Sequence, residues 1–213
     1  MKIVKWLTAV CVAFPLLAAQ AGELHLDYSD FYSHLRKLDD EELQPLHFAF
    51  GFVNVQSKDL CQVQSVMINT DKMDIPVDVM ANNRFVLPTE KALKLAKARL
   101  FIKLSEPENR CDLSVLLEAK PALFQDGVDA AELGMLMAAF QRFFDKMGSF
   151  LSFMMPSATG LQITVADDSL VPEAFKALST FNSGHWHVEA ASLPKLPNEI
   201  RLEGVQRITA LTQ

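Results

Sequence analysis

Between residues 46 and 117 the chain consists of short runs in which apolar residues alternate with polar ones. Segments 69–71, 82–83 and 106–109, which contain Asn, Asp or Pro, separate these runs and are typical of turns. Successive side chains of a β-strand point to opposite faces, so a period of two predicts strands with one buried face. Several short strands at this spacing predict an antiparallel β-sheet or sandwich. The alternating apolar residues include Ile75, Val77, Val79, Leu100, Ile102, Leu104, Leu113, Val115 and Leu117.

Two other segments have the 3.6-residue period of an amphipathic helix. The first spans residues 28–38, where Asp27 can cap the first turn, and the second spans about 128–147, where Gly148 can end the helix. Residues 89–98 fit either a short helix or a strand. We therefore expect an α+β protein in which both amphipathic helices pack on the antiparallel sheet. It should form a single domain over residues 22–213, with a possible sub-boundary near residue 120.

The N-terminus has the pattern of a secretory signal peptide. Lys2 and Lys5 precede an apolar stretch over residues 6–17, and Ala19-Gln20-Ala21 fits the cleavage motif. The stretch is shorter than the roughly 20 residues that span a bilayer, so a cleaved leader is favoured over a retained anchor. We expect cleavage after Ala21, a periplasmic protein, and no transmembrane segment in the mature chain. Losing both lysines would change the net charge from −6 to −8.

Cys11 lies in the predicted leader, so the mature chain would keep Cys61 and Cys111. An exported protein with two cysteines is expected to join them in a disulfide. Closing a loop of this length would stabilise the fold by about 4 kcal/mol in the chain-entropy model. The alternative is a redox or metal-binding pair, but the chain has no Cys-x-x-Cys motif and no His beside either cysteine.

Several short motifs occur along the chain in a characteristic order. They are Tyr28-Ser29 with Tyr32 and Leu35, Phe52-Val53-Asn54, Cys61, Leu87-Pro88, Cys111-Asp112-Leu113-Ser114, Gly148-Ser149-Phe150, and Pro156 through Gly160-Leu161. In this order, with both cysteines, the sequence resembles an uncharacterised exported-protein family of Gram-negative bacteria, domain-of-unknown-function family 2987. The resemblance extends over most of the mature chain and is weakest beyond residue 165. It implies an exported single-domain protein and carries no activity, cofactor or catalytic residues.

Composition and motifs exclude several classes of function. Half of the residues are hydrophobic, which excludes a disordered chain, and the net charge of −6 argues against a nucleic-acid-binding protein. The chain contains no Gly-x-Ser-x-Gly, Walker A, His-Glu-x-x-His or Gly-x-Gly-x-x-Gly motif, so no catalytic residue is identified and no cofactor is expected. The acidic run at 39–42 is expected to be a solvated linker, because it implies no ligand geometry.

An apolar stretch rich in Met and Phe, residues 133–155, is the first candidate for a functional surface. Methionine is flexible and is common on adaptable binding surfaces, so this stretch could bind a lipid, a peptide or a partner protein. The alternative is a core helix whose methionines fill gaps. The candidate ligand or partner surface consists of Met135, Met137, Phe140, Phe144, Phe150, Phe153, Met154 and Met155.

His185 and His187 are the second candidate. On a strand, both imidazoles would point to the same face and could bind Zn²⁺ or Cu ions, although a third ligand would be needed. The alternative is a half-exposed strand with Trp186 packed inward. We expect a non-enzymatic periplasmic binding or envelope-associated protein that uses the apolar stretch. The other hypotheses are a periplasmic hydrolase with an unrecognised site, and a metal-handling protein that uses the two histidines.

Overall fold

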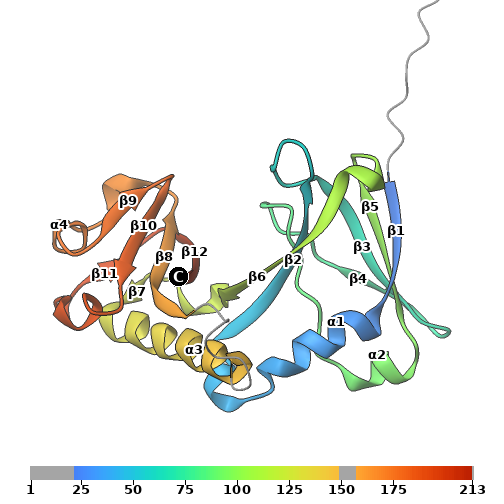
Figure 1. The fold of residues 1–213 in the computed structure, drawn as a ribbon, viewed down its shortest axis with the longest axis horizontal. Helices are drawn as coiled ribbons and strands as arrows, with labels where there is room; N and C mark the ends of the chain where they lie inside the picture. Colours follow the sequence, from blue (N-terminus) through green and yellow to red (C-terminus); the bar gives the residue numbers. More distant parts are fainter. Residues whose placement is uncertain (1–21, 149–156, 213) are drawn as a thin grey trace, which may run out of the picture.

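The computed structural model describes residues 22–148 and 157–212, which form an α+β fold with antiparallel sheets (Figure 1). This confirms the fold class expected from the alternating pattern. The first sheet has the order β1 (Gly22–Asp27), β5 (Arg99–Leu104), β3 (Val63–Asn69) and β4 (Asp74–Val77). The second sheet has the order β2 (Leu46–Asn54), β6 (Cys111–Ala119), β12 (Val205–Thr212), β8 (Ala158–Val165), β10 (His185–Glu189) and β9 (Thr180–Asn182). A small third sheet pairs β11 (Arg201–Leu202) with β7 (Val128–Asp129).

Both amphipathic helices form close to their predicted positions. The first is α1 (Tyr28–Leu35), and the chain continues in a 3-10 turn to Leu38. The second is α3 (Ala130–Gly148). A capping box fixes its start, since Asp129 Oδ1 accepts from the Glu132 N–H at 2.8 Å and Glu132 Oε2 accepts from the Asp129 N–H at 2.9 Å. The short helices are α2 (Lys91–Leu95) and α4 (Glu173–Lys176).

Residues 22–119 fold into an incomplete barrel. The wall begins at β1 and passes through β5, β3 and β4. The chain beyond β4 then forms the bridge Val79–Phe85, and Phe85 pairs in turn with Phe50 of β2, which lies beside β6. Aromatic and aliphatic side chains from the two sheets fill the interior, where the Phe31 ring of α1 meets Phe50 edge-on at 5.1 Å. Among the described residues, β1 pairs only with β5, so the wall has a seam between β1 and β6.

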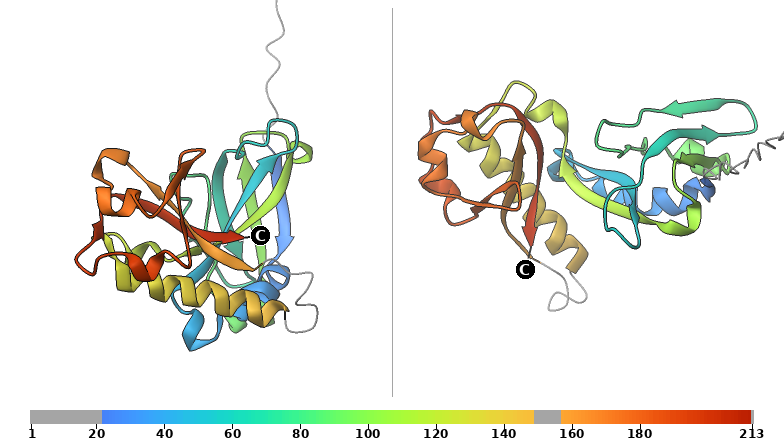
Figure 2. Two further views of the ribbon diagram at one scale, coloured as in Figure 1. Left: turned by 60° about the vertical axis from the view of Figure 1, so that its left-hand side comes forward. Right: turned by 90° about the horizontal axis from the view of Figure 1, so that it is seen from above.

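Residues 120–148 and 157–212 form a second lobe, in which α3 packs along one side of the strands (Figure 2). Leu133, Leu136 and Phe140 are fully buried, as are Leu161 and Ile163 of β8. Strands β6 and β12 are joined at a single register pair, Glu118–Thr209. The barrel and the second lobe are thus connected by one narrow point of strand pairing and by packing against α3.

The Cys61–Cys111 disulfide is present, with a Cα–Cα distance of 6.4 Å. It ties the start of β6 to the segment that precedes β3, and Cys61 is fully buried. Among the described residues, no helix is both long and apolar enough to cross a membrane.

Candidate functional site

The backbone of β6 is open along the seam. Phe50 and Phe85 exchange both of their backbone hydrogen bonds at 2.8 Å, so the peptide groups of Phe50 point away from β6. Phe50 lies opposite Val115, and hydrogen-bonded and non-hydrogen-bonded pairs alternate in an antiparallel ladder. The N–H and C=O of Val115 must therefore point away from β2, toward the seam. The same holds for Leu113, which lies opposite Phe52, whose carbonyl accepts from the Cys61 N–H at 2.8 Å.

No described residue pairs with β6 at Leu113 or Val115, since the β6–β12 pairing is confined to Glu118 and Thr209. Both side chains are also unusually open for apolar strand residues, each 48% exposed. Unpaired edge strands of this kind are templates for pairing with another chain, and most proteins protect them with charges, proline or a covering element. Within the described part of the chain, β6 therefore presents backbone groups without a partner together with apolar side chains.

An apolar groove of about 260 Å³ lies at the seam. Its walls come from both sides, because Leu26 belongs to β1 whereas Leu113 and Val115 belong to β6. Phe50 of β2 and Phe31 of α1 are the other apolar wall residues, and Asp30 and His34 of α1 supply polar groups. Such a groove can accept the apolar side chains of a peptide, while the backbone of the peptide forms hydrogen bonds with the adjacent strand edge.

The predicted surface on α3 lies mostly against the core in its described part. Met137 is only 4% exposed and Phe140 is fully buried, whereas Met135 is 44% exposed and Phe144 is partly buried. The alternative of a core helix with methionine as gap filler therefore describes Met137 and Phe140 better. The other candidates, Phe150, Phe153, Met154 and Met155, lie outside the described residues.

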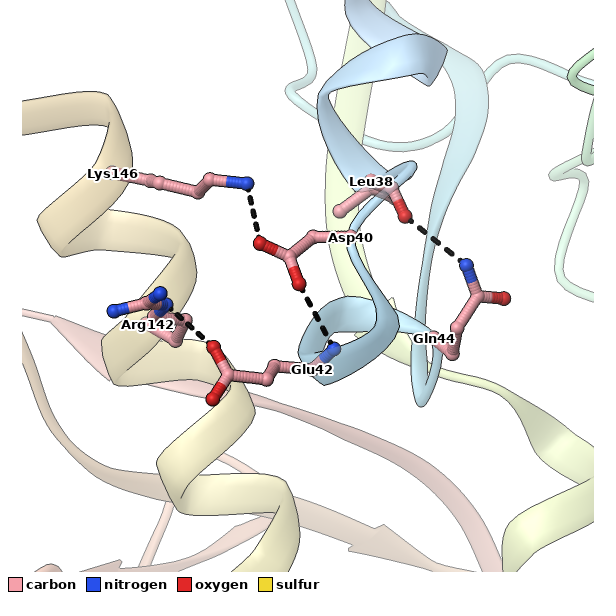
Figure 3. Close-up of polar contacts among 6 residues, drawn as sticks. All are labelled: Leu38, Asp40, Glu42, Gln44, Arg142 and Lys146. Carbon is pink, nitrogen blue, oxygen red and sulfur yellow. Dashed lines mark hydrogen bonds and ion pairs between the residues drawn. The ribbon is translucent and has the colours of Figure 1, made fainter.

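The acidic run at 39–42 is exposed except at Asp40, which is half-buried, and it makes contacts that a solvated linker would not make (Figure 3). Asp40 Oδ2 accepts from Lys146 Nζ at 2.6 Å, and Glu42 pairs with the Arg142 guanidinium at 2.8 Å. The bond from Lys146 and, after it, the bond from the Glu42 N–H lower the pKa of the Asp40 carboxyl. These contacts tie the segment between α1 and β2 to α3.

A hollow of about 580 Å³ adjoins these ion pairs. Three basic and three acidic side chains line it, so it has no net charge to select an anion or a cation. Its apolar walls are limited to Phe143 and Met147. We therefore place the candidate site at the seam.

His185 and His187 lie on β10 and share one face of the sheet, as the strand prediction requires. His185 Nδ1 lies 3.0 Å from Thr164 Oγ1, and burial, then the positive charge of Arg207, lowers the His185 pKa. Among the described residues, no group of three neighbouring His, Cys, Asp or Glu ligands includes either histidine. The one such group is Cys61, Glu106 and Cys111, whose sulfurs are joined in the disulfide. A metal site at the two histidines stays an unsupported prediction.

The sequence predicted that β6 is a strand, but it did not predict that one edge of this strand is unpaired. Leu113 and Val115 alternate with polar residues like any half-buried strand, and nothing local distinguishes an edge from a central position. One feature of the sequence could have indicated the open edge. Edge strands often carry a charged residue or proline that prevents pairing with another chain, and Leu113, Val115 and Leu117 include neither.

One family matches the chain. Its description is "Protein of unknown function (DUF2987)", and the match covers residues 20–165. No curated protein and no solved structure matches. Every residue that lines the groove falls within the matched stretch, whereas His185 and His187 fall outside it.

Proposed function

Since the chain belongs to the DUF2987 family of proteins of unknown function, which supplies no activity, we propose a function from the seam: the protein binds an extended peptide segment. The segment adds as a strand to β6 and places apolar side chains in the groove. The single observation that carries this proposal is the coincidence of free backbone groups and exposed apolar side chains at Leu113 and Val115. A lipid could fill the apolar groove, but it could not use the row of peptide donors and acceptors.

The barrel also defines the direction of the peptide. Each neighbouring pair around the wall is antiparallel, from β1 through β5, β3, β4 and the Phe85 segment to β2 and β6. This alternation makes β1 and β6 run in the same direction. One added strand can therefore be antiparallel to both edges, which is the arrangement with the straighter hydrogen bonds. Its side chains would alternate between the groove and the outside, so the ligand should have apolar residues at every second position.

The proposed location is the periplasm, where extended segments of envelope proteins would be the partners. The leader-like N-terminus and the Cys61–Cys111 disulfide support export, because disulfides persist in oxidising compartments. The proposed mode is binding without catalysis.

The test uses isothermal titration calorimetry with a capped peptide in which Val and Thr alternate between terminal lysines. The control peptide has the same composition with its valines grouped together, so that they cannot all face one side. We expect the alternating peptide to bind more tightly than the grouped one. Equal affinity for the two peptides, or no binding of either, would contradict the proposal.

Two variants of one residue separate backbone pairing from packing. Val115→Pro removes the N–H that points to the seam but leaves the ladder to β2 intact, so it should abolish binding. Val115→Thr keeps the backbone donor and a similar shape, so it should bind within a few-fold of the parent. Circular dichroism and thermal midpoints check that both variants fold. If the proline variant folds and still binds the peptide, the edge is not the site. A stable dimer that Val115→Pro breaks would assign the edge to a second copy of the chain instead.

A further inference from the structure

A row of polar side chains crosses the second sheet on the face opposite to α3. Register pairs place these residues side by side, and residues that lie directly opposite each other share a face. The row is unbroken over the six strands of the sheet and passes from the barrel into the second lobe through the single β6–β12 pair. In spatial order it consists of His47, Glu118, Thr209, Gln162, His187 and Thr180.

Three buried side-chain atoms in the described chain have no hydrogen-bond partner, and all three lie on this face. They are Arg84 Nε, Glu118 Oε2 and His187 Nε2. Glu118 is 3% exposed and Arg84 is 7% exposed, so both side chains are more than nine-tenths buried. Buried polar groups are nearly always satisfied, and three unsatisfied ones on one face indicate that a hydrogen-bonding ligand belongs there.

Arg84 lies across the β2–β6 pair rather than in an ion pair. Its guanidinium donates to the Ala49 carbonyl at 3.4 Å and to Ser114 Oγ at 3.3 Å, both long for such bonds. Its aliphatic part passes over Gly51, where an added Cβ would lie 3.2 Å from Arg84 Cγ. Glycine at this position thus leaves room for the Arg84 side chain against the sheet. Most of its five N–H groups remain available to an acceptor.

The charges of this face favour an anion. Arg207 lies opposite Thr164 in β8, beside His185. Burial lowers the pKa of Arg84 most, the nearby Glu118 carboxylate raises it, and the positive charge of Arg207 lowers it. Among the described residues, Glu118 is the only buried acid on the face, and its Oε1 lies 3.1 Å from His47 Nε2. None of the ion pairs between described residues includes either arginine. The face therefore carries two arginines and one buried acid in a chain of net charge −6.

The geometry points to a binding site for a small hydroxylated oxyanion on this face, held by Arg84 and Arg207 with a ligand hydroxyl donated to Glu118. The oxyanion, either a carboxylate or a phosphate, would satisfy the guanidinium groups. The hydroxyl would satisfy Glu118 Oε2, which can only accept while it is ionised. Acidic sugars and sugar phosphates have both kinds of group.

Access to the buried atoms would require a local movement, because these atoms are almost fully covered. The movement that we propose is a slight separation of β6 and β12, which a single register pair joins among the described residues. Asp112 and Glu189 are exposed and lie at the two ends of the same face, away from the arginines. Their negative charges would repel a large polyanion that extends over the whole face more than a small ligand between the arginines.

The test is calorimetric titration of the full-length mature protein with glucuronate and with glucose 6-phosphate, which distinguish a carboxylate from a phosphate. Glucose and inorganic phosphate are the comparison ligands, each lacking one of the two groups. We expect at least one of the charged sugars to bind at least tenfold more tightly than either comparison ligand. If neither charged sugar binds, or if inorganic phosphate binds as tightly as the sugars, the proposal is overturned.

Variants locate the site. Arg207→Gln, at a partly exposed position, should weaken binding by about tenfold or more, as expected for the loss of a charge-assisted hydrogen bond. Arg84→Gln should do the same, and if it fails to fold, Arg207→Gln still decides the question. The exposed Arg110→Gln is the matched control and should bind like the parent. Unchanged affinity in Arg207→Gln would overturn the site. Val115→Pro should retain binding of the sugar, so this proposal and the peptide proposal can fail separately.

Discussion

Replacing both Cys61 and Cys111 with alanine removes the covalent link between the start of β6 and the segment before β3. The two cysteines are 50 residues apart in the chain. The chain-entropy relation for a loop of that length gives a loss of about 4 kcal/mol in the free energy of unfolding. For a protein of this size, each kcal/mol lowers the melting temperature by about 2–4 °C, so the variant should melt about 8–16 °C lower.

Urea unfolding followed by circular dichroism measures this difference, with the parent protein unfolded in the presence and absence of a phosphine reductant as the control. The reduced parent should match the double variant, because both lack the same constraint and differ only in two sulfur atoms. Thiol titration of the unreduced parent should find no free sulfhydryl at either position. If the variant loses less than about 1 kcal/mol, or if the reduced parent is as stable as the oxidised one, the link does not brace the barrel as argued.

Three further predictions concern positions outside the disulfide. Gly160→Ala should lower the free energy of unfolding by about 1–3 kcal/mol, because the new Cβ would clash with the backbone carbonyl oxygen of Val188 in β10, and urea titration measures this. Lys146→Ala should raise the lowered pKa of Asp40 toward its ordinary value. The Asp40–Lys146 pair stabilises the fold above that ordinary value and is lost as the pH falls through the lowered one, which carboxyl NMR titration can follow. Met135→Lys should be tolerated, whereas Met137→Lys should unfold the protein or lower its melting temperature by more than 10 °C, because only Met137 is buried.

The strands and the disulfide were predictable because their signals are local or simple. The period of two over residues 46–117 corresponds to β2–β6, and the two cysteines outside the predicted leader allow only one pairing within a chain. The same holds for α1 and α3, whose apolar stripes follow the helical period. These patterns predict the secondary structure of each segment, and they do not depend on which segments become neighbours in the fold.

The seam and the polar row could not be predicted, because both depend on contacts between distant parts of the chain. The His47–Glu118 bond joins residues that are 71 positions apart, and the Asp40–Lys146 bond joins residues that are 106 apart. Whether the edge of β6 stays open depends on the order of strands in the sheet, which the alternation of Leu113 and Val115 does not encode. The position of Arg84 could not be predicted either. In the sequence it is a basic residue beside a turn, whereas in the fold its side chain crosses the sheet.

The position of β12 in its sheet has a consequence for how the protein folds. This strand comes last among the described elements, yet it lies in the interior of the sheet, with β6 on one side and β8 on the other. A chain that emerges N-terminus first can close the barrel from β1–β6 early, but the second sheet must wait until residues 205–212 arrive. Until then, β8 exposes an unpaired apolar edge, which is where aggregation begins in slowly completed sheets. Chaperones that shield strand edges would be needed most in this interval.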